Sequence, residues 1–142
     1  MKKNKKLAKE IVLFINTSKD KQLDVFLIKK ERIADKIKIM GDFKVSENLL
    51  KLINKLLKKN KIVPEQLKGI IVVSGPGPFT SLRIAAAVAN TLSFTLQIPI
   101  AGIANKDNLP DSQLIKKGLK EIKIGNYIHP FYNREPNITI SK

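Results

Sequence analysis

The chain has 142 residues, no cysteine and a formal net charge of +15. Its length suits one packed domain, and apolar residues, 43% of the sequence, fall in separated runs that predict an ordinary globular interior. The lack of cysteine excludes disulfides, thiolate nucleophiles and cysteine metal sites, and the one histidine, His129, has no metal-type residues beside it.

The amino end, residues 1–10, is a lysine-rich tail, and the apolar run 11–15 behind it is far shorter than a signal-peptide core or a membrane span. We therefore expect a soluble, cytoplasmic protein without membrane contact. The high net positive charge has two possible explanations. Either the lysines form a surface that attracts polyanions, or lysine is simply the residue used at solvated positions, as at Lys55, Lys58 and Lys59.

Three strands are predicted first, over residues 11–16, 23–28 and 33–40, joined by short polar links as in an antiparallel meander. In the third strand Ile33, Ile37 and Ile39 are expected to face inward. Its polar residues, Asp35, Lys36 and Lys38, are expected to face water.

A helix follows, because apolar residues recur at three- and four-residue spacing: Val45, Leu49, Leu50, Ile53, Leu56 and Leu57. Ser46 is the predicted N-cap, and Glu47 would lie at the positive end of the helix dipole. This helix should end within residues 60–64.

A short strand that is apolar on both faces is expected over residues 69–74, as for a central parallel strand. The run Gly75-Pro76-Gly77-Pro78 must be a tight turn. A helix over 79–97 and a strand over 98–103 complete the pattern. Residues 114–124 read as a short helix or a strand, and 126–142 read as a tail.

This order predicts an α/β fold with a five-stranded mixed sheet and helices packed on its faces. It matches the ribonuclease-H-like half of the actin-like ATPase fold.

The helix over 79–97 carries one charged residue, Arg83, although a surface helix normally has a polar stripe. The sheet should receive Leu82, Ala86, Leu92 and Leu96, leaving Ile84, Val88 and Thr91 for a second contact. Small residues at four-residue spacing, Ser81, Ala85, Ala89 and Ser93, would form a ridge that another helix can approach. The first helix and the tail could cover the remaining face, but we favour a protein partner.

Residues 74–85, Ser-Gly-Pro-Gly-Pro-Phe-Thr-Ser-Leu-Arg-Ile-Ala, resemble the Gly-Pro-Gly-Ser-Phe-Thr-Gly-Leu-Arg-Ile-Gly signature of the TsaB family. Three further blocks, 11–18, 45–50 and 98–103, resemble that family in the correct order, and 130–136 resemble its closing Pro-x-Tyr-x-Arg segment. The resemblance implies a TsaB-type domain over 11–104. Residues 105–142 would be a shortened connector and carboxyl tail that replace most of the family's second subdomain.

The family resemblance implies a non-catalytic subunit in the synthesis of threonylcarbamoyladenosine in tRNA, next to the anticodon. Such a subunit pairs with the catalytic TsaD, and the ATPase TsaE joins the assembly; a homodimer and a tRNA contact through the basic surface stay open. No cofactor is implied. The expected partner interface consists of Phe79, Thr80, Ser81, Arg83, Ile84, Ala85, Val88 and Ala89.

Three positions depart from the family pattern. Asn16 replaces an aspartate in the segment Asn16, Thr17 and Ser18, where the superfamily holds phosphate or metal, and an amide is a poor magnesium ligand and no general base. Ser81 and Ala85 replace signature glycines, and Val45 replaces a histidine. We expect no catalytic residue and no metal ligand.

Two other functions remain in competition. The net charge favours an RNA-binding module of the same fold, in which lysines of the amino tail and first helix form a basic track. A peptidase or an ATPase fits least, since the Gly-Pro run lacks the Gly-Lys-Ser/Thr ending of a P-loop and its prolines remove amide donors.

Overall fold

The computed structural model describes residues 11–123. Its five strands are β1 (Ile11–Asn16), β2 (Gln22–Lys29), β3 (Arg32–Met40), β4 (Leu67–Gly75) and β5 (Ile100–Ala104). Its helices are α2 (Val45–Lys59), a 3-10 turn η1 (Pro64–Gln66), α3 (Phe79–Leu96) and α4 (Asp111–Lys123). The predicted sequence of strands and helices over 11–103 is confirmed.

The strands form one mixed sheet in the order β3-β2-β1-β4-β5. β1 pairs antiparallel with β2 and parallel with β4, β2 pairs antiparallel with β3, and β4 pairs parallel with β5. The predicted meander and the central parallel strand are both confirmed. All six side chains of β1 are buried, because helices cover both faces of the sheet.

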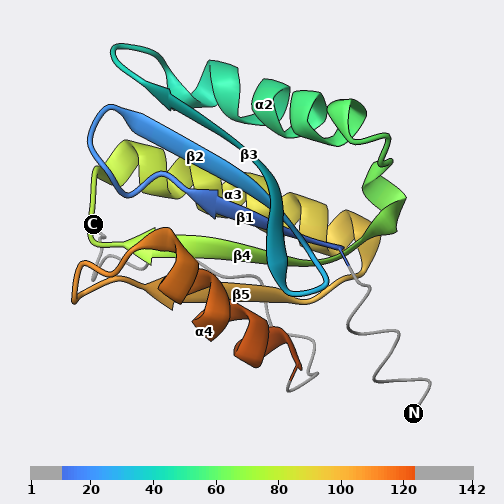
Figure 1. Ribbon diagram of the computed structural model, residues 1–142. Coiled ribbons are helices and arrows are strands. Elements are labelled where there is room, and N and C mark those ends of the chain that lie inside the picture. Colours follow the sequence, from blue (N-terminus) through green and yellow to red (C-terminus); the bar gives the residue numbers. More distant parts are fainter. Residues whose placement is uncertain (1–10, 124–142) are drawn as a thin grey trace, which may run out of the picture.

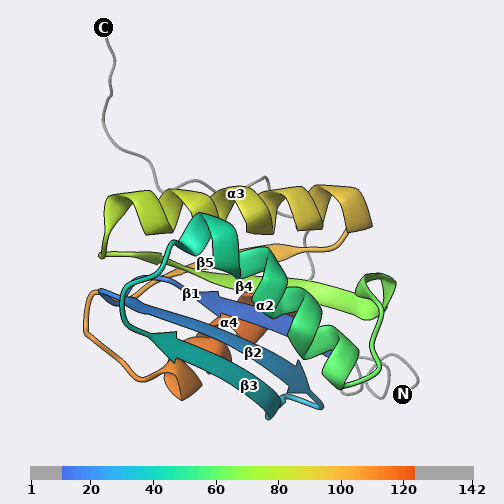
Figure 2. The ribbon, with the colours of Figure 1, turned by 90° about the horizontal axis from the view of Figure 1, so that it is seen from above.

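Helices α2 and α3 lie on one face and α4 lies on the other, as Figures 1 and 2 show. Under α2 and α3 the core contains Leu13, Ile15 and Leu27 from the sheet, together with Leu49 and Ala89 from the helices. The opposite core packs sheet residues such as Phe14, Ile71 and Val73 against Leu114 and Ile115 of α4. The two-residue side-chain period of the strands divides the apolar residues between these layers.

Residues 114–124, for which helix and strand were both open, belong for the most part to helix α4. Gly118 lets this helix approach the sheet, because a Cβ at this position would lie 2.6 Å from Ile71 Cγ2. Residues 105–123 thus pack on the same unit as β1 to β5. Predictions for the amino tail, His129 and the carboxyl tail concern residues outside the described part.

Three local predictions are wrong. Ile33 was expected to face inward with Ile37 and Ile39, but its side chain is 40% exposed. The N-cap of α2 is Lys44 rather than Ser46, and it makes no side-chain capping bond; Glu47 does lie in the first turn, as expected. Asp35 does not face water with Lys36 and Lys38, because Asn60 Nδ2 donates to its Oδ2 at 2.9 Å and Lys59 Nζ lies 3.4 Å from the same oxygen.

Strand β3 lies at the edge of the sheet. Its lysines cover an aromatic side chain of β2, with Lys36 Nζ 5.7 Å and Lys38 Nζ 5.6 Å from the Phe26 ring centroid. None of the helices within residues 11–123 combines the length and hydropathy of a membrane-spanning segment.

Candidate functional site

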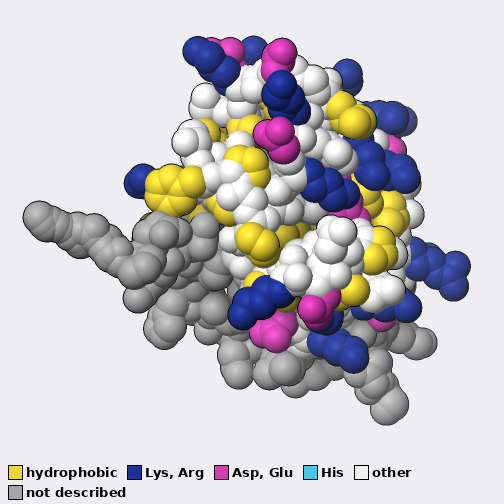
Figure 3. Space-filling view, turned by 90° about the vertical axis from the view of Figure 1, so that its left-hand side faces the viewer, with side chains coloured by type: hydrophobic (Ala, Val, Ile, Leu, Met, Phe, Trp, Pro, Cys, Tyr) yellow, Lys and Arg dark blue, Asp and Glu magenta, His cyan; other side chains and the backbone are white. Residues whose placement is uncertain are grey.

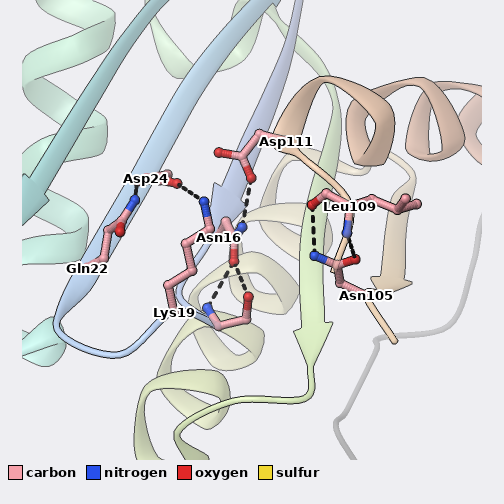
Figure 4. Close-up of polar contacts among 8 residues, drawn as sticks. Asn16, Lys19, Gln22, Asp24, Asn105, Leu109 and Asp111 are labelled. Atoms are coloured by element: carbon pink, nitrogen blue, oxygen red, sulfur yellow. Dashed lines mark hydrogen bonds and ion pairs between the residues drawn. The ribbon is translucent and has the colours of Figure 1, made fainter. Parts of the chain in front are cut away.

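The carboxyl end of β1 places a buried asparagine between two other segments. Asn16 is 1% exposed. Its Nδ2 donates to Asp111 Oδ1 at 2.8 Å, and its Oδ1 accepts from Ser18 N at 2.9 Å and Ser18 Oγ at 2.6 Å (Figure 4). Both ends of the amide are therefore engaged within the chain.

The side chains of the two residues after Asn16 also form hydrogen bonds within the chain. Thr17 is fully buried, and its hydroxyl donates to the Ser81 carbonyl oxygen in the first turn of α3 at 3.0 Å. The Ser18 hydroxyl is directed to Asn16. The three polar side chains predicted to mark the superfamily's phosphate or metal position thus hold the end of β1 against α3 and α4.

The Gly-Pro turn between β4 and α3 closes over the same segment. A Cβ on Gly77 would lie 2.3 Å from the Ser18 carbonyl oxygen and 2.8 Å from Ser18 Cα. Real Cβ atoms do not approach the backbone so closely. Glycine is therefore required at this position because the Ser18 backbone lies so near, and not because of an unusual φ.

Two carboxylates meet beside Asn16, and the sequence analysis named neither of them. Asp24 of β2 is fully buried and Asp111 is 7% exposed. Gln22 Nε2 donates to Asp24 Oδ1 at 3.0 Å, and Lys19 Nζ lies 3.6 Å from Asp24 Oδ2. Figure 4 shows these side chains converging from β1, β2 and the start of α4.

Burial raises the pKa of Asp24, and a hydrogen bond with Asp111 and the charge of that carboxyl raise it further. Gln22 and Lys19 act in the opposite direction. The Oδ2 atoms of Asp24 and Asp111 have no other hydrogen-bond partner in the described structure.

Asn105 fixes the turn that presents Asp111. Its Nδ2 donates to the Leu109 carbonyl oxygen at 3.0 Å, and its Oδ1 accepts from Leu109 N at 2.7 Å. Sequence reasoning could have found Asp24, because a carboxylate within the apolar run Leu23 to Ile28 is unusual in a strand buried on both faces. Asp111 had no such signal, since an acid at the start of a helix is ordinary capping chemistry.

Figure 3 views the molecule from the edge at which β1, β4 and β5 end. Lysine, acidic and hydrophobic side chains are intermixed on it, so this edge has no field of a single sign. A cavity of about 150 Å³ opens there, with walls that include Lys21, Asp42, Pro78 and Ser81. Within residues 11–123 no group of three or more His, Cys, Asp or Glu side chains is placed to hold a metal ion.

The second candidate site is the surface of α3. We define its outer face as Phe79, Thr80, Arg83, Ala87, Thr91 and Phe94, which are exposed and recur at helical spacing. Phe79 is 46% and Phe94 is 66% exposed. The Arg83 guanidinium carbon lies 5.3 Å from the Phe79 ring centroid, and a shallow pocket lies between Phe79, Thr80, Arg83, Ile84 and Ala87.

The eight residues predicted for a partner interface divide by exposure. Phe79, Thr80 and Arg83 lie on the outer face; Ser81, Ile84 and Val88 are half-buried. Ala85 and Ala89 are fully buried, so their side chains are not available to a partner in this conformation. Sequence reasoning overlooked Ala87 and Phe94, although both follow the spacing of Thr80 and Arg83.

The small residues of α3 pack against the rest of this chain. Ala85 and Ala89 pack in the core beneath α3, where small side chains allow a close approach to the sheet. The hydroxyl of Ser93, also buried, donates to the Ile98 carbonyl oxygen at 2.5 Å and closes the connection to β5. Leu82 and Ala86 are buried as predicted, and Thr91 is exposed.

Comparison with known proteins places this architecture in a family. A family model described as TsaD, tRNA N6-adenosine threonylcarbamoyltransferase, matches residues 44–119, more than half of the chain. A relative from Buchnera aphidicola subsp. Schizaphis graminum, the tRNA threonylcarbamoyladenosine biosynthesis protein TsaB, is 32% identical over 123 residues. That match covers 81% of this chain and 54% of the relative, so the chain spans about half of the relative's length.

The TsaB protein of Bacillus subtilis is 35% identical over 57 residues, which cover 40% of this chain and 25% of that protein. The structure of YeaZ from Pseudomonas aeruginosa superposes with a TM-score of 0.58 at 25% identity, over 67% of this chain and 43% of that one. A second crystal structure, described as having similarity to the peptidase YeaZ from the same organism, gives a TM-score of 0.62 at 26% identity and covers the same shares.

These matches support the ribonuclease-H-like α/β fold that the order of elements predicts, and they agree with the signature in residues 74–85. The chain belongs to the TsaB family of tRNA threonylcarbamoyladenosine biosynthesis proteins, within the wider family that the TsaD model describes.

Proposed function

We propose that this chain is a non-catalytic subunit in tRNA threonylcarbamoyladenosine biosynthesis, and that it pairs with a TsaD-like catalytic subunit through the outer face of α3. The observation that carries the proposal is the composition of that face. It holds two exposed phenylalanines and a single charge, Arg83.

Exposed aromatic side chains are unfavourable in water and typical of interface centres, where Phe and Arg are enriched. Burial of the two rings would contribute about 1 to 3 kcal/mol each to association. Ile84 and Val88, half-buried at the margin, would extend the contact towards α2. Ala85 and Ala89 would support the interface from below by seating α3 on the sheet.

The state of Asn16 supports a non-catalytic role. A metal ligand or general base needs a free lone pair directed at the substrate, but the Asn16 amide donates to Asp111 and accepts from Ser18. Thr17 is likewise committed to α3. In this proposal the chemistry belongs to the TsaD-like subunit, and a TsaE-like ATPase binds the assembly. Residues 105–142 would take the place of the second subdomain.

The test is to co-express the chain with the TsaD homologue from the same genome and to determine the mass of the product by size-exclusion chromatography with light scattering. A one-to-one complex is expected. Thr91→Asp should abolish it, because Thr91 is exposed on the outer face and an acid there would have to be desolvated.

Gln113→Asp is the matched control, since Gln113 is exposed on α4 across the sheet and acquires the same charge. This variant should still form the complex. The mass of the chain on its own decides whether it forms a homodimer. Failure to associate with TsaD, even when tRNA is present, or association that survives Thr91→Asp, would overturn the proposal.

A further inference from the structure

A second surface, separate from α3, carries a concentration of positive charge. We define the lysine face as Lys51, Asn54, Lys55, Lys58 and Lys59, which lie on the exposed side of α2. From Lys51 to Lys59 the helix rises about 12 Å, at 1.5 Å per residue. The buried side of α2, including Leu49, Ile53 and Leu56, is seated in the core, which fixes the direction of the lysine face.

The charge on this face is largely uncompensated. Lys59 pairs with Asp35 at 3.4 Å. Within residues 11–123, Lys51, Lys55 and Lys58 have no carboxylate within 4.0 Å. Glu47, the one acid of α2, lies in the first turn beside Lys44. Three ammonium groups thus project from less than three turns of helix without a counter-ion from the described chain.

A shallow hollow lies between the side chains of this face. Lys51, Asn54, Lys55, Lys58 and Lys59 line one hollow, and no acidic side chain contributes to its wall. Four ammonium groups and one amide supply its hydrogen-bond donors. This differs from the strand-end side of the molecule, where acids and lysines are intermixed (Figure 3). A hollow lined in this way suits an anion with several acceptor oxygens.

We propose that the lysine face binds the phosphate backbone of RNA. Membership of a family named for tRNA modification favours RNA over other polyanions. At an axial phosphate spacing of about 3.4 Å per strand, a 12 Å row of lysines spans about three phosphates. The contact is independent of the sequence of the RNA, and it is made by a helix surface other than the outer face of α3.

The experiment measures binding of the full chain to labelled, unfractionated tRNA by fluorescence anisotropy between 50 and 200 mM salt. The triple variant Lys51→Gln, Lys55→Gln, Lys58→Gln removes about three phosphate contacts. At about 0.7 per contact, the slope of log affinity against log salt should become shallower by about 2. Over this fourfold change in salt, the wild-type chain should lose about 16-fold more affinity than the variant.

The control removes the same charge from the opposite face of the sheet. Lys116, Lys117 and Lys120 are exposed on α4, and their triple replacement by glutamine should leave the salt slope near that of the wild type. Replacement of the three α2 lysines by arginine should preserve binding. Thermal unfolding of each variant checks that the fold is intact.

Equal loss of affinity in the two glutamine variants would overturn the proposal, because binding would then follow net charge. Wild-type binding that does not depend on salt would overturn it too. So would a lysine-face variant that loses binding only to anionic phospholipid vesicles and retains tRNA. Pairing with TsaD is measured separately, and it should survive the α2 substitutions.

Discussion

The Asn16 side-chain amide donates a 2.8 Å hydrogen bond to Asp111, from the end of the first strand to the start of the last described helix, 95 residues away. The bond is buried. It joins the central strand to a helix that packs on the sheet mainly through apolar side chains, and it does so with the residue that departs from the family's aspartate.

Asn16→Asp should destabilise the chain. The substitution removes the donor to Asp111 and places a third carboxyl beside Asp24 and Asp111. The loss of one buried partner alone costs about 1 to 3 kcal/mol, and charge repulsion adds to it at neutral pH. Chemical denaturation at pH 5 and pH 8 should show the larger loss at pH 8.

Asn16→Ala serves as the control, because it removes the same hydrogen bond without adding a charge. Its loss in the free energy of unfolding should be similar at both pH values. If the aspartate variant also shows no difference between pH 5 and pH 8, repulsion among the three carboxyls is not the cause.

Asp24→Asn should reduce the pH dependence of stability. The pKa of Asp24 is raised by burial and by Asp111, so the folded state holds its proton more tightly than the unfolded state does. Stability is therefore fully present below the unfolded pKa, about 3.9, and is lost as the pH rises through the folded pKa. The amide of an asparagine can donate a hydrogen bond to Asp111 at any pH, whereas a carboxyl can do so only when it is protonated. The variant should therefore become more stable relative to the wild type as the pH rises.

Asp35→Asn should change the pH dependence of stability in the opposite direction, and it serves as a control for the measurement. A hydrogen bond from Asn60, one from Lys36 N and the Lys59 ammonium lower the pKa of Asp35. Its contribution is present above the unfolded pKa and is lost as the pH falls through the folded value. Urea titrations between pH 3 and pH 8 should separate the two variants; parallel curves for Asp24→Asn and wild type would contradict the raised pKa of Asp24.

Gly77→Ala should destabilise the turn between β4 and α3. The added methyl group would meet the backbone of Ser18, which cannot rotate away as a side chain can. Overpacking of this kind typically costs about 1 to 3 kcal/mol. Gly69→Ala is the comparison, since the nearest atoms to its methyl group would belong to the Ile122 side chain, at 3.0 Å, and a smaller loss in melting temperature is expected.

Ala85→Glu and Ala87→Glu form a matched pair on α3. Ala85 is fully buried, and a glutamate there would bring an unpaired charge into the core at a cost of several kcal/mol. Ala87 is exposed, so the same substitution should leave the melting temperature nearly unchanged while it weakens association with TsaD. Equal stability of the two variants would contradict the orientation of α3 described here.

The order of strands and helices was predictable because the apolar residues of each segment recur with the spacing of a strand or of a helix. The burial of the small residues on α3 was not, because Ala85 and Ala89 suit a helix that approaches another protein as well as one that approaches its own sheet. The choice depends on where Phe94 and Ala87 point, and that follows from the position of the whole helix on the sheet.

The site at Asn16 was predictable only in part. The sequence identified Asn16 as a poor ligand, but it gave no indication that Asp24 and Asp111 would meet there. Their approach depends on the antiparallel register that pairs Asn16 with Asp24, and on the turn that Asn105 holds at the end of β5. Both are tertiary features that no local pattern encodes.

Strand β3, described above as the edge of the sheet, also bears on self-association at high concentration. Within residues 11–123 it has a neighbour on one side only, so its outer backbone groups are a template for a strand of another molecule. Arg32, Lys36 and Lys38 give every copy the same positive edge, and two such edges repel one another. Because added salt screens that repulsion, the resistance of this protein to fibrous aggregation should decline as ionic strength rises.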